Sequence, residues 1–167
     1  MANGGALSWK SRSAHAYVIR SRLNLFANFT FLDDFNNSAQ IGQADSRTTT
    51  GINAKHTVLG KWGSHDVENT AGLQSRNDNI QVGLFNTAQR ARAGTVRDDH
   101  VVESSVALYG QNSLRWNEWL RSVAGLRADY FRARVSSDNP LNSGVVNDHM
   151  ISPKLSLIFG PWAKTEY

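Results

Sequence analysis

The sequence contains no cysteine, only three prolines and no long apolar run. Without cysteine the chain has neither a disulfide framework nor a thiolate metal site. No window approaches the roughly 18 uninterrupted apolar residues of a membrane-spanning helix. This absence says nothing against crossings by strands, because membrane strands alternate apolar with polar residues and average out to ordinary hydropathy.

Helical periodicity and the common catalytic motifs are also lacking. No segment places apolar residues at i, i+3, i+4 and i+7, and there is no P-loop, G-x-S-x-G or dinucleotide fingerprint. The 18 Lys and Arg, against 14 Asp and Glu, are scattered singly, whereas a nucleic-acid partner requires a patch. We therefore expect no enzyme, no cofactor and no nucleic-acid partner.

What the sequence has instead is a period of two. In LRWNEWLRSVAGLRADY (114–130), apolar residues such as Leu126 and polar residues such as Arg127 exchange places at every step, as in a strand with one dry and one wet face. The pattern recurs in five more segments: 17–31, 47–58, 67–76, 100–111 and 152–160. Segment 17–31 far exceeds the roughly 5–6 residues of a typical globular strand. The sequence therefore predicts an all-β fold with strands long enough to cross a bilayer, which takes about 9–11 residues.

Tryptophans add a second, longer period. Four of them lie 53, 54 and 46 residues apart, each beside a short polar break: Trp9, Trp62, Trp116 and Trp162. Between successive breaks lie two alternating segments and one longer irregular stretch, at 33–46, 77–98 and 136–147. Short turns on one side, long loops on the other and aromatic residues at the interfaces are typical of transmembrane β-barrels. We interpret the alternating run 80–90 as a β extension of its loop and not as another crossing.

Several segments resemble the barrel of a TonB-dependent outer-membrane receptor: LNLFANFTFLDD (23–34), QADSRTTTG (43–51), VENTAGLQSRND (67–78), GLFNT (83–87), RDDHVVESSVALYGQN (97–112), WLRSVAGLRADYF (119–131) and ISPKLSLIFGP (151–161). The most specific part is GLRADY followed by SPKLSLIFGP. The resemblance implies a large barrel around a separate plug domain in a Gram-negative outer membrane. It also implies binding of scarce nutrients such as ferric siderophores or cobalamin, with uptake driven by an inner-membrane energy-transducing complex.

We therefore predict that residues 1–167 are one part of such a barrel, with the plug domain and the remaining strands absent. The expected fold is all-β, an antiparallel up-and-down meander of about six to eight long strands with short periplasmic turns and long extracellular loops. The expected partners are outer-membrane lipid, a small-molecule ligand such as a metal chelate, and the energy-transducing complex through the missing N-terminal part. The alternative from another class is a soluble or secreted β-sandwich that binds a ligand.

The two parities predict two environments for the side chains. The predicted lumen-facing residues are Arg22, Arg47, Lys55, Glu68, Arg121, Arg127, Asp129 and Lys154. The predicted lipid-facing residues are Leu23, Leu25, Phe29, Leu126, Tyr130 and Leu157. The predicted interface aromatics are Trp62, Trp116, Trp119 and Trp162.

Two short motifs, DDH (98–100) and NDH (147–149), are candidates for catalytic or metal-binding chemistry. If their strands were close, both motifs would meet at the outer rim, as in a barrel protease that uses an Asp/His pair. Asp and Asn also favour turns, and the histidines show no spacing typical of a ligand pair. We therefore predict solvated strand ends here, with no catalytic residue and no metal site.

Overall fold

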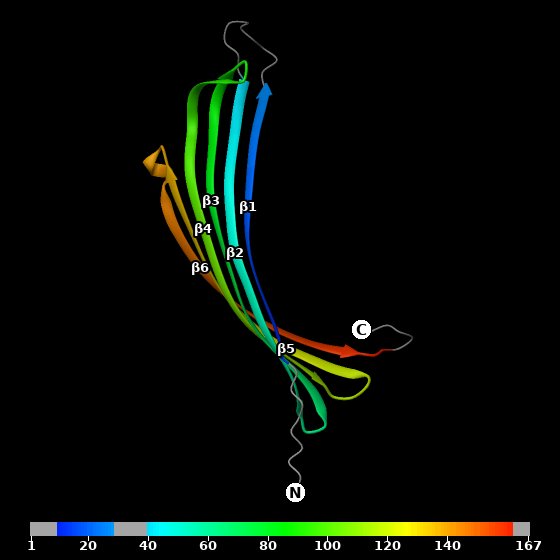
Figure 1. The fold of residues 1–167 in the computed structure, drawn as a ribbon. Coiled ribbons are helices and arrows are strands. Elements are labelled where there is room, and N and C mark those ends of the chain that lie inside the picture. Colours follow the sequence, from blue (N-terminus) through cyan, green and yellow to red (C-terminus); the bar gives the residue numbers. More distant parts are fainter. Residues whose placement is uncertain (1–9, 29–39, 162–167) are drawn as a thin grey trace.

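The computed structural model describes residues 10–28 and 40–161 as a single six-stranded sheet in which the strands lie in chain order (Figure 1). Its elements are β1 (Lys10–Asn28), β2 (Gln40–Trp62), β3 (His65–Ala88), β4 (Ala91–Arg115), β5 (Leu120–Ser137), the short 3-10 helix η1 (Pro140–Asn142) and β6 (Gly144–Phe159). All five neighbouring pairs are antiparallel. The predicted all-β, up-and-down meander is confirmed.

The sheet is one curved layer (Figure 1). Across residues 10–28 and 40–161 every strand belongs to this one sheet, so no second sheet packs on it as a β-sandwich requires. In the same ranges no helix is long and apolar enough to cross a membrane.

The strands run further than the sequence predicted. Residues 77–98, predicted as a long loop, continue β3 and β4 up to a tight turn at Gln89 and Arg90, where φ is 49° and 65°. The run 80–90 is thus an extension of one hairpin and no separate crossing, as interpreted. The predicted loop 136–147 is also mostly ordered, because η1 and the ends of β5 and β6 occupy it. In 33–46, β2 already begins at Gln40, and the earlier residues lie outside the described part.

These errors have one cause. The polar composition of 77–98 indicated exposure to water, and exposure was taken as irregular backbone. Yet a ladder of backbone hydrogen bonds needs only a paired neighbour, and polar residues such as Asn77 and Ser104 pair as regularly as apolar ones. The polar composition of this stretch therefore does not mark the ends of the strands.

The turns at the opposite end are short, and three tryptophans gather beside them. Trp62 and Trp116 make an edge-to-face contact with ring centroids 6.3 Å apart. Trp119 stacks on Phe159 at 6.3 Å, and the Trp116 indole donates a hydrogen bond to Ser122. Trp162 lies outside the described residues.

Register divides the sheet into two faces, which we name after adjacent residues of β5. The Leu126 face includes the cross-strand row Ala54, Leu73, Leu108, Ala128 and Ile151. The Arg127 face includes the neighbouring row Lys55, Gly72, Tyr109, Arg127 and Ser152. Because side chains alternate across a strand, each residue's face follows from its pairing alone.

Two tyrosines on the Arg127 face lie flat over glycines of the next strand. Tyr109 is paired with Gly72 and Tyr17 with Gly51. A methyl group placed on either glycine would lie 2.3 Å from the ring of its tyrosine. The missing side chain is what lets each ring approach the backbone, so these glycines serve packing on the sheet surface.

We predict that Gly72→Ala lowers the free energy of unfolding by about 1–3 kcal/mol, as overpacked sites do, because the Tyr109 ring must swing away. Gly60→Ala is the matched control, since no atom lies within 4 Å of its added methyl group. The control should be neutral or stabilising by up to about 1 kcal/mol. Urea unfolding in detergent micelles, followed by tryptophan fluorescence, measures both. Equal effects would contradict the Tyr109–Gly72 contact.

Candidate functional site

Seven of the eight residues predicted to face the lumen share the Arg127 face: Arg47, Lys55, Glu68, Arg121, Arg127, Asp129 and Lys154. Three of the residues predicted to face lipid share the Leu126 face: Leu126, Tyr130 and Leu157. Across β2 to β6, then, the residues predicted to share a face do so, while the assignment of one face to lipid and the other to the lumen stays a prediction. Phe29 lies outside the described residues.

The division predicted for β1 is wrong. Arg22 pairs with Ser46 and so lies on the Leu126 face, whereas Leu23 and Leu25 pair with Asp45 and Gln43 and lie on the Arg127 face. Leu23 and Leu25 therefore share a face with Arg127, and Arg22 shares one with Leu126. The two parities of β1 were identified correctly but assigned to the opposite faces.

The assignment failed because it assumed that the more apolar parity always faces the apolar surroundings. Along β1 the Leu126 face begins with Lys10 and Arg12 and is apolar at Ala14, Ala16 and Val18. From Arg20 to Asn24 it is polar, before Phe26 near the end of the strand. Leu23 and Leu25 lie on the stretch beyond Val18, where neither face need meet an apolar phase. Alternation shows which residues of one strand share a face. The pairing of β1 with β2 is needed to decide which face of β1 continues the Leu126 face.

Over β2 to β6 the Leu126 face carries a largely apolar belt above the short turns, interrupted by polar residues such as His56 and Ser122. On β1 the cross-strand row of Leu126 ends at Arg12. The belt is bounded at the far end by one cross-strand row, Ile52, Ser75, Val106, Tyr130 and His149. Within it Leu108, Leu126 and Leu155 are 61%, 56% and 77% exposed. Asn69 and Asn112, polar residues in the belt, satisfy each other with a 2.8 Å hydrogen bond. An apolar surface of this extent requires an apolar partner.

On the Arg127 face, several pairs of oppositely charged residues are in contact: Lys61–Asp66, Arg76–Asp78, Arg97–Asp99 and Arg127–Asp129. The Arg127 guanidinium donates hydrogen bonds of 2.8–3.0 Å to Asp129 on its own strand, and its Nη1 donates one of 2.7 Å to Gln74 on β3. Gln74 was not predicted as a site residue. Its contact with Arg127 spans the intervening strand β4 and so connects β3 with β5. The guanidinium is thereby held flat against the wall, with its charge offset by a neighbouring carboxylate.

A second polar cluster lies farther from the short turns. Asp78, 3% exposed, accepts hydrogen bonds from Arg76 and from Thr49, which is itself 6% exposed. Asp78 is beyond the apolar belt, and the Arg76 guanidinium holds the pKa of its carboxyl below the usual range in spite of burial. Glu103 lies directly opposite Asp78 on β4, so Arg76 also offsets a like-charge neighbour.

Thr49 and Asp78 were missed at the sequence level, because Thr49 lies in a polar run and Asp78 in a predicted loop. The paired glycines and tyrosines were missed as well. One usable signal was present: Gly51 and Gly72 both interrupt otherwise regular strands, and a glycine inside a strand often marks a close approach. The identity of the approaching ring, however, depends on register.

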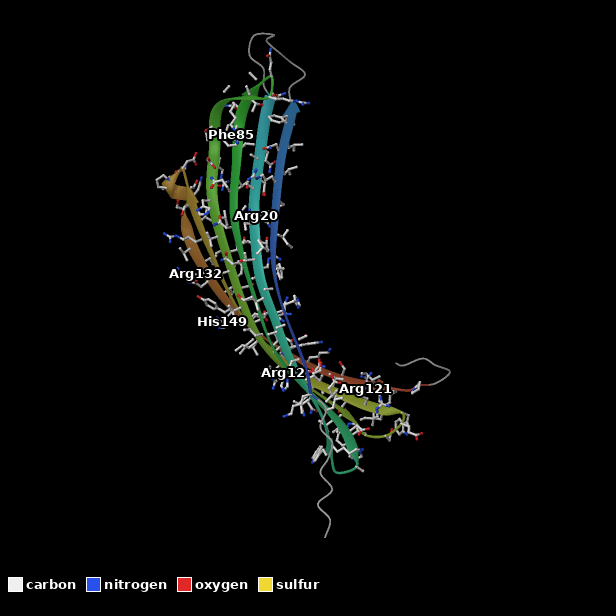
Figure 2. All side chains as sticks on the ribbon, in the orientation of Figure 1. Arg12, Arg20, Phe85, Arg121, Arg132 and His149 are labelled. Atoms are coloured by element: carbon white, nitrogen blue, oxygen red, sulfur yellow. The ribbon has the colours of Figure 1, made fainter. Side chains whose placement is uncertain are left out.

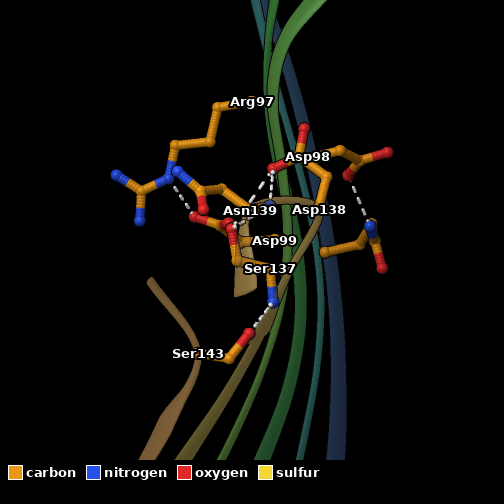
Figure 3. A network of polar contacts seen from close by, with 8 residues as sticks. Arg97, Asp98, Asp99, Ser137, Asp138, Asn139 and Ser143 are labelled. Atoms are coloured by element: carbon orange, nitrogen blue, oxygen red, sulfur yellow. Dashed lines mark hydrogen bonds and ion pairs between the residues drawn. The ribbon is translucent and has the colours of Figure 1, made fainter. Parts of the chain in front are cut away.

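The far end of β4 is tied to the β5–β6 connection by polar contacts (Figure 3). The Asp138 amide donates to the Asp98 carbonyl at 3.1 Å, and the Ser137 amide donates to Ser143 Oγ at 2.9 Å. Asp99, 2% exposed, pairs with Arg97. These contacts hold the β5–β6 connection against β4.

The structure does not bring the two Asp/His motifs together. His100 pairs with Ser136 of β5 and His149 with Tyr130, a separation of six residues along β5, or about 20 Å. Asp98 and Asp99 also point to opposite faces. In the described residues no group of three or more His, Asp or Glu can hold a metal ion. The geometry therefore offers a wall with one apolar and one polar face, and no acid–base pair.

Comparison with family models gives one match: the model described as TonB dependent receptor-like, beta-barrel, fits residues 2–164. Comparison with curated proteins gives no match. The family match covers nearly the whole chain and agrees with the long antiparallel strands, the short turns beside tryptophans and the division into two faces. The chain belongs to the family of TonB-dependent receptor β-barrels, which are receptors and transporters of the Gram-negative outer membrane and not enzymes.

Proposed function

We propose that this chain forms part of the wall of an outer-membrane receptor for energised uptake of a scarce nutrient. In this proposal the Leu126 face contacts lipid and the Arg127 face lines the lumen. The partners are outer-membrane lipid, a small-molecule ligand such as a metal chelate of the siderophore type or cobalamin, and an inner-membrane energy-transducing complex. The family supports the receptor class, and the two faces support the placement.

The observation that carries the placement is the height of the apolar belt. On β5 it runs from Leu120, next to Trp119, to Tyr130. Ten steps of about 3.3 Å give about 33 Å along the strand. A strand tilted by about 40° would then span about 25 Å, the height of the apolar band on outer-membrane barrels. Aromatic residues at both limits of the belt suit the two interfaces.

The Arg127 face suits a lumen for the opposite reason. Its charges are of both signs, and several are paired within the wall, as in the Arg127–Asp129 and Arg76–Asp78 contacts. Such a surface tolerates water and can contact a polar domain or solute inside the barrel, but it would be costly against acyl chains.

We predict that Leu126→Arg lowers the free energy of folding into lipid vesicles by about 2–4 kcal/mol, the cost of a cation near the midplane of the lipid face. Arg127→Leu, at the next position, should cost about 1 kcal/mol or less, because it removes only a partly solvated ion pair. Folding titrations of the full-length protein decide between the faces. A larger loss of folding free energy for Arg127→Leu than for Leu126→Arg would mean that the Arg127 face contacts lipid, and it would refute the placement.

We further predict that cells relying on this receptor accumulate one radiolabelled ferric chelate or cobalamin only when the energy-transducing protein is present. The measurement compares uptake in otherwise identical cells with and without that protein. Cells lacking the receptor are the control for other entry routes. Uptake that continues unchanged without the transducer would indicate a passive pore and contradict the proposed function.

A further inference from the structure

Charges are distributed unequally between the two faces. On the Leu126 face, up to the irregular end of the β3–β4 hairpin, the charged residues are Lys10, Arg12, Arg20, Arg22, Arg132, Arg134 and a single acid, Asp98. The other acids of the six strands all lie on the Arg127 face: Asp45, Asp66, Glu68, Asp78, Asp99, Glu103, Asp129 and Asp148. Both faces carry cations, but only the Arg127 face supplies them with carboxylates.

Four of the Leu126-face cations, which we call the arginine band, lie just beyond the apolar belt: Arg20 and Arg22 on β1, Arg132 and Arg134 on β5. On β5 the band begins two residues after Tyr130. On β1 the same boundary row falls at Ala16, and Arg20 follows it by four residues. Figure 2 shows Arg20 and Arg132 on the long part of the wall, away from Arg12 and Arg121 near the short turns. The band therefore lies at the end of the belt opposite the tryptophans.

The band differs in its partners from three arginines of the other face. All four side chains are exposed, and within residues 10–28 and 40–161 none makes a hydrogen bond or ion pair. Arg76, Arg97 and Arg127 on the Arg127 face are each paired with an aspartate. A strip of unpaired like charges attracts anions and repels other cations.

The geometry points to phosphate-bearing lipid head groups as the partner of the arginine band. This inference rests on the proposed contact between the Leu126 face and lipid, since acyl chains against the belt would place their head groups at its edge. A guanidinium binds phosphate through two parallel hydrogen bonds. Arginine also extends its charge toward the head groups while its methylenes remain on apolar surface.

The spacing indicates two separate lipid sites. Residues two apart on one face of a strand are about 7 Å apart, so Arg132 and Arg134 can grip one phosphate or two adjacent ones. β1 and β5 are four strand spacings apart, about 19 Å, too far for both pairs to share a phosphate. Neutral hydrogen-bonding residues such as Thr48 and Asn79 lie between the pairs on the same face and add no repulsion.

The test titrates the full-length protein in detergent with lipid A that carries two phosphates and counts bound lipid by native mass spectrometry. Replacing Arg132 and Arg134 by Gln should weaken lipid binding about tenfold, and raising the salt should weaken wild-type binding because exposed charges are screened. The matched control removes two charges from the other face, through Arg47→Gln and Lys55→Gln. The control should bind lipid A as the wild type does.

Three results would overturn the inference. An equal loss in the control variant would mean that net charge alone attracts the lipid. Displacement of lipid A by millimolar inorganic phosphate would mean that the band binds free anions. Dimers that form through this face and exclude lipid would make a second copy the partner. Each Arg→Gln variant is first checked for its heat-resistant folded band on gels, and the Leu126→Arg titration tests separately whether the face meets lipid.

Discussion

One continuous ladder of antiparallel backbone hydrogen bonds determines everything else in this structure. Each strand is paired along nearly its whole length, so no residue can change face without breaking its pairing with both neighbours. Among the described residues only a few apolar side chains, such as Ile80, Phe85 and Leu114, are buried, and most large apolar residues are exposed. The surroundings of the sheet, and not its interior, must therefore account for the pattern of side chains.

The two faces differ in how many of their side chains find a suitable partner within the sheet. The Arg127 face is partly compensated from within, since Arg76, Arg97 and Arg127 each contact a carboxylate and Tyr17 and Tyr109 cover glycines. The Leu126 face is not, because it presents exposed leucines in the belt and, beyond it, arginines that have no partner within residues 10–28 and 40–161. We propose that lipid completes both parts, with acyl chains against the belt and phosphates against the arginine band.

The sequence predicted the fold class, the short turns and the faces of β2 to β6, because each of these depends on local alternation. It failed where the answer depends on pairing. Arg22, Leu23 and Leu25 were each assigned to the wrong face. They lie on the part of β1 beyond the belt, where the hydropathy of a side chain does not indicate which face it occupies. The contacts of Arg127 with Gln74 and of Asp78 with Thr49 join residues that are 53 and 29 positions apart in sequence. The ordered extension 77–98 was missed because of its polar composition.

The most direct measurement of the central claim is a spin-label scan along β1 and β5 of the full-length protein in lipid bilayers, using accessibility to oxygen and to a water-soluble nickel chelate. The account predicts oxygen accessibility at Ala14, Ala16 and Val18 in phase with Leu126 and Ala128, with the intervening positions more accessible to the chelate. Oxygen accessibility at His15, Tyr17 and Ile19 instead, with β5 unchanged, would contradict the register that connects the two strands and the single lipid-facing surface built on it.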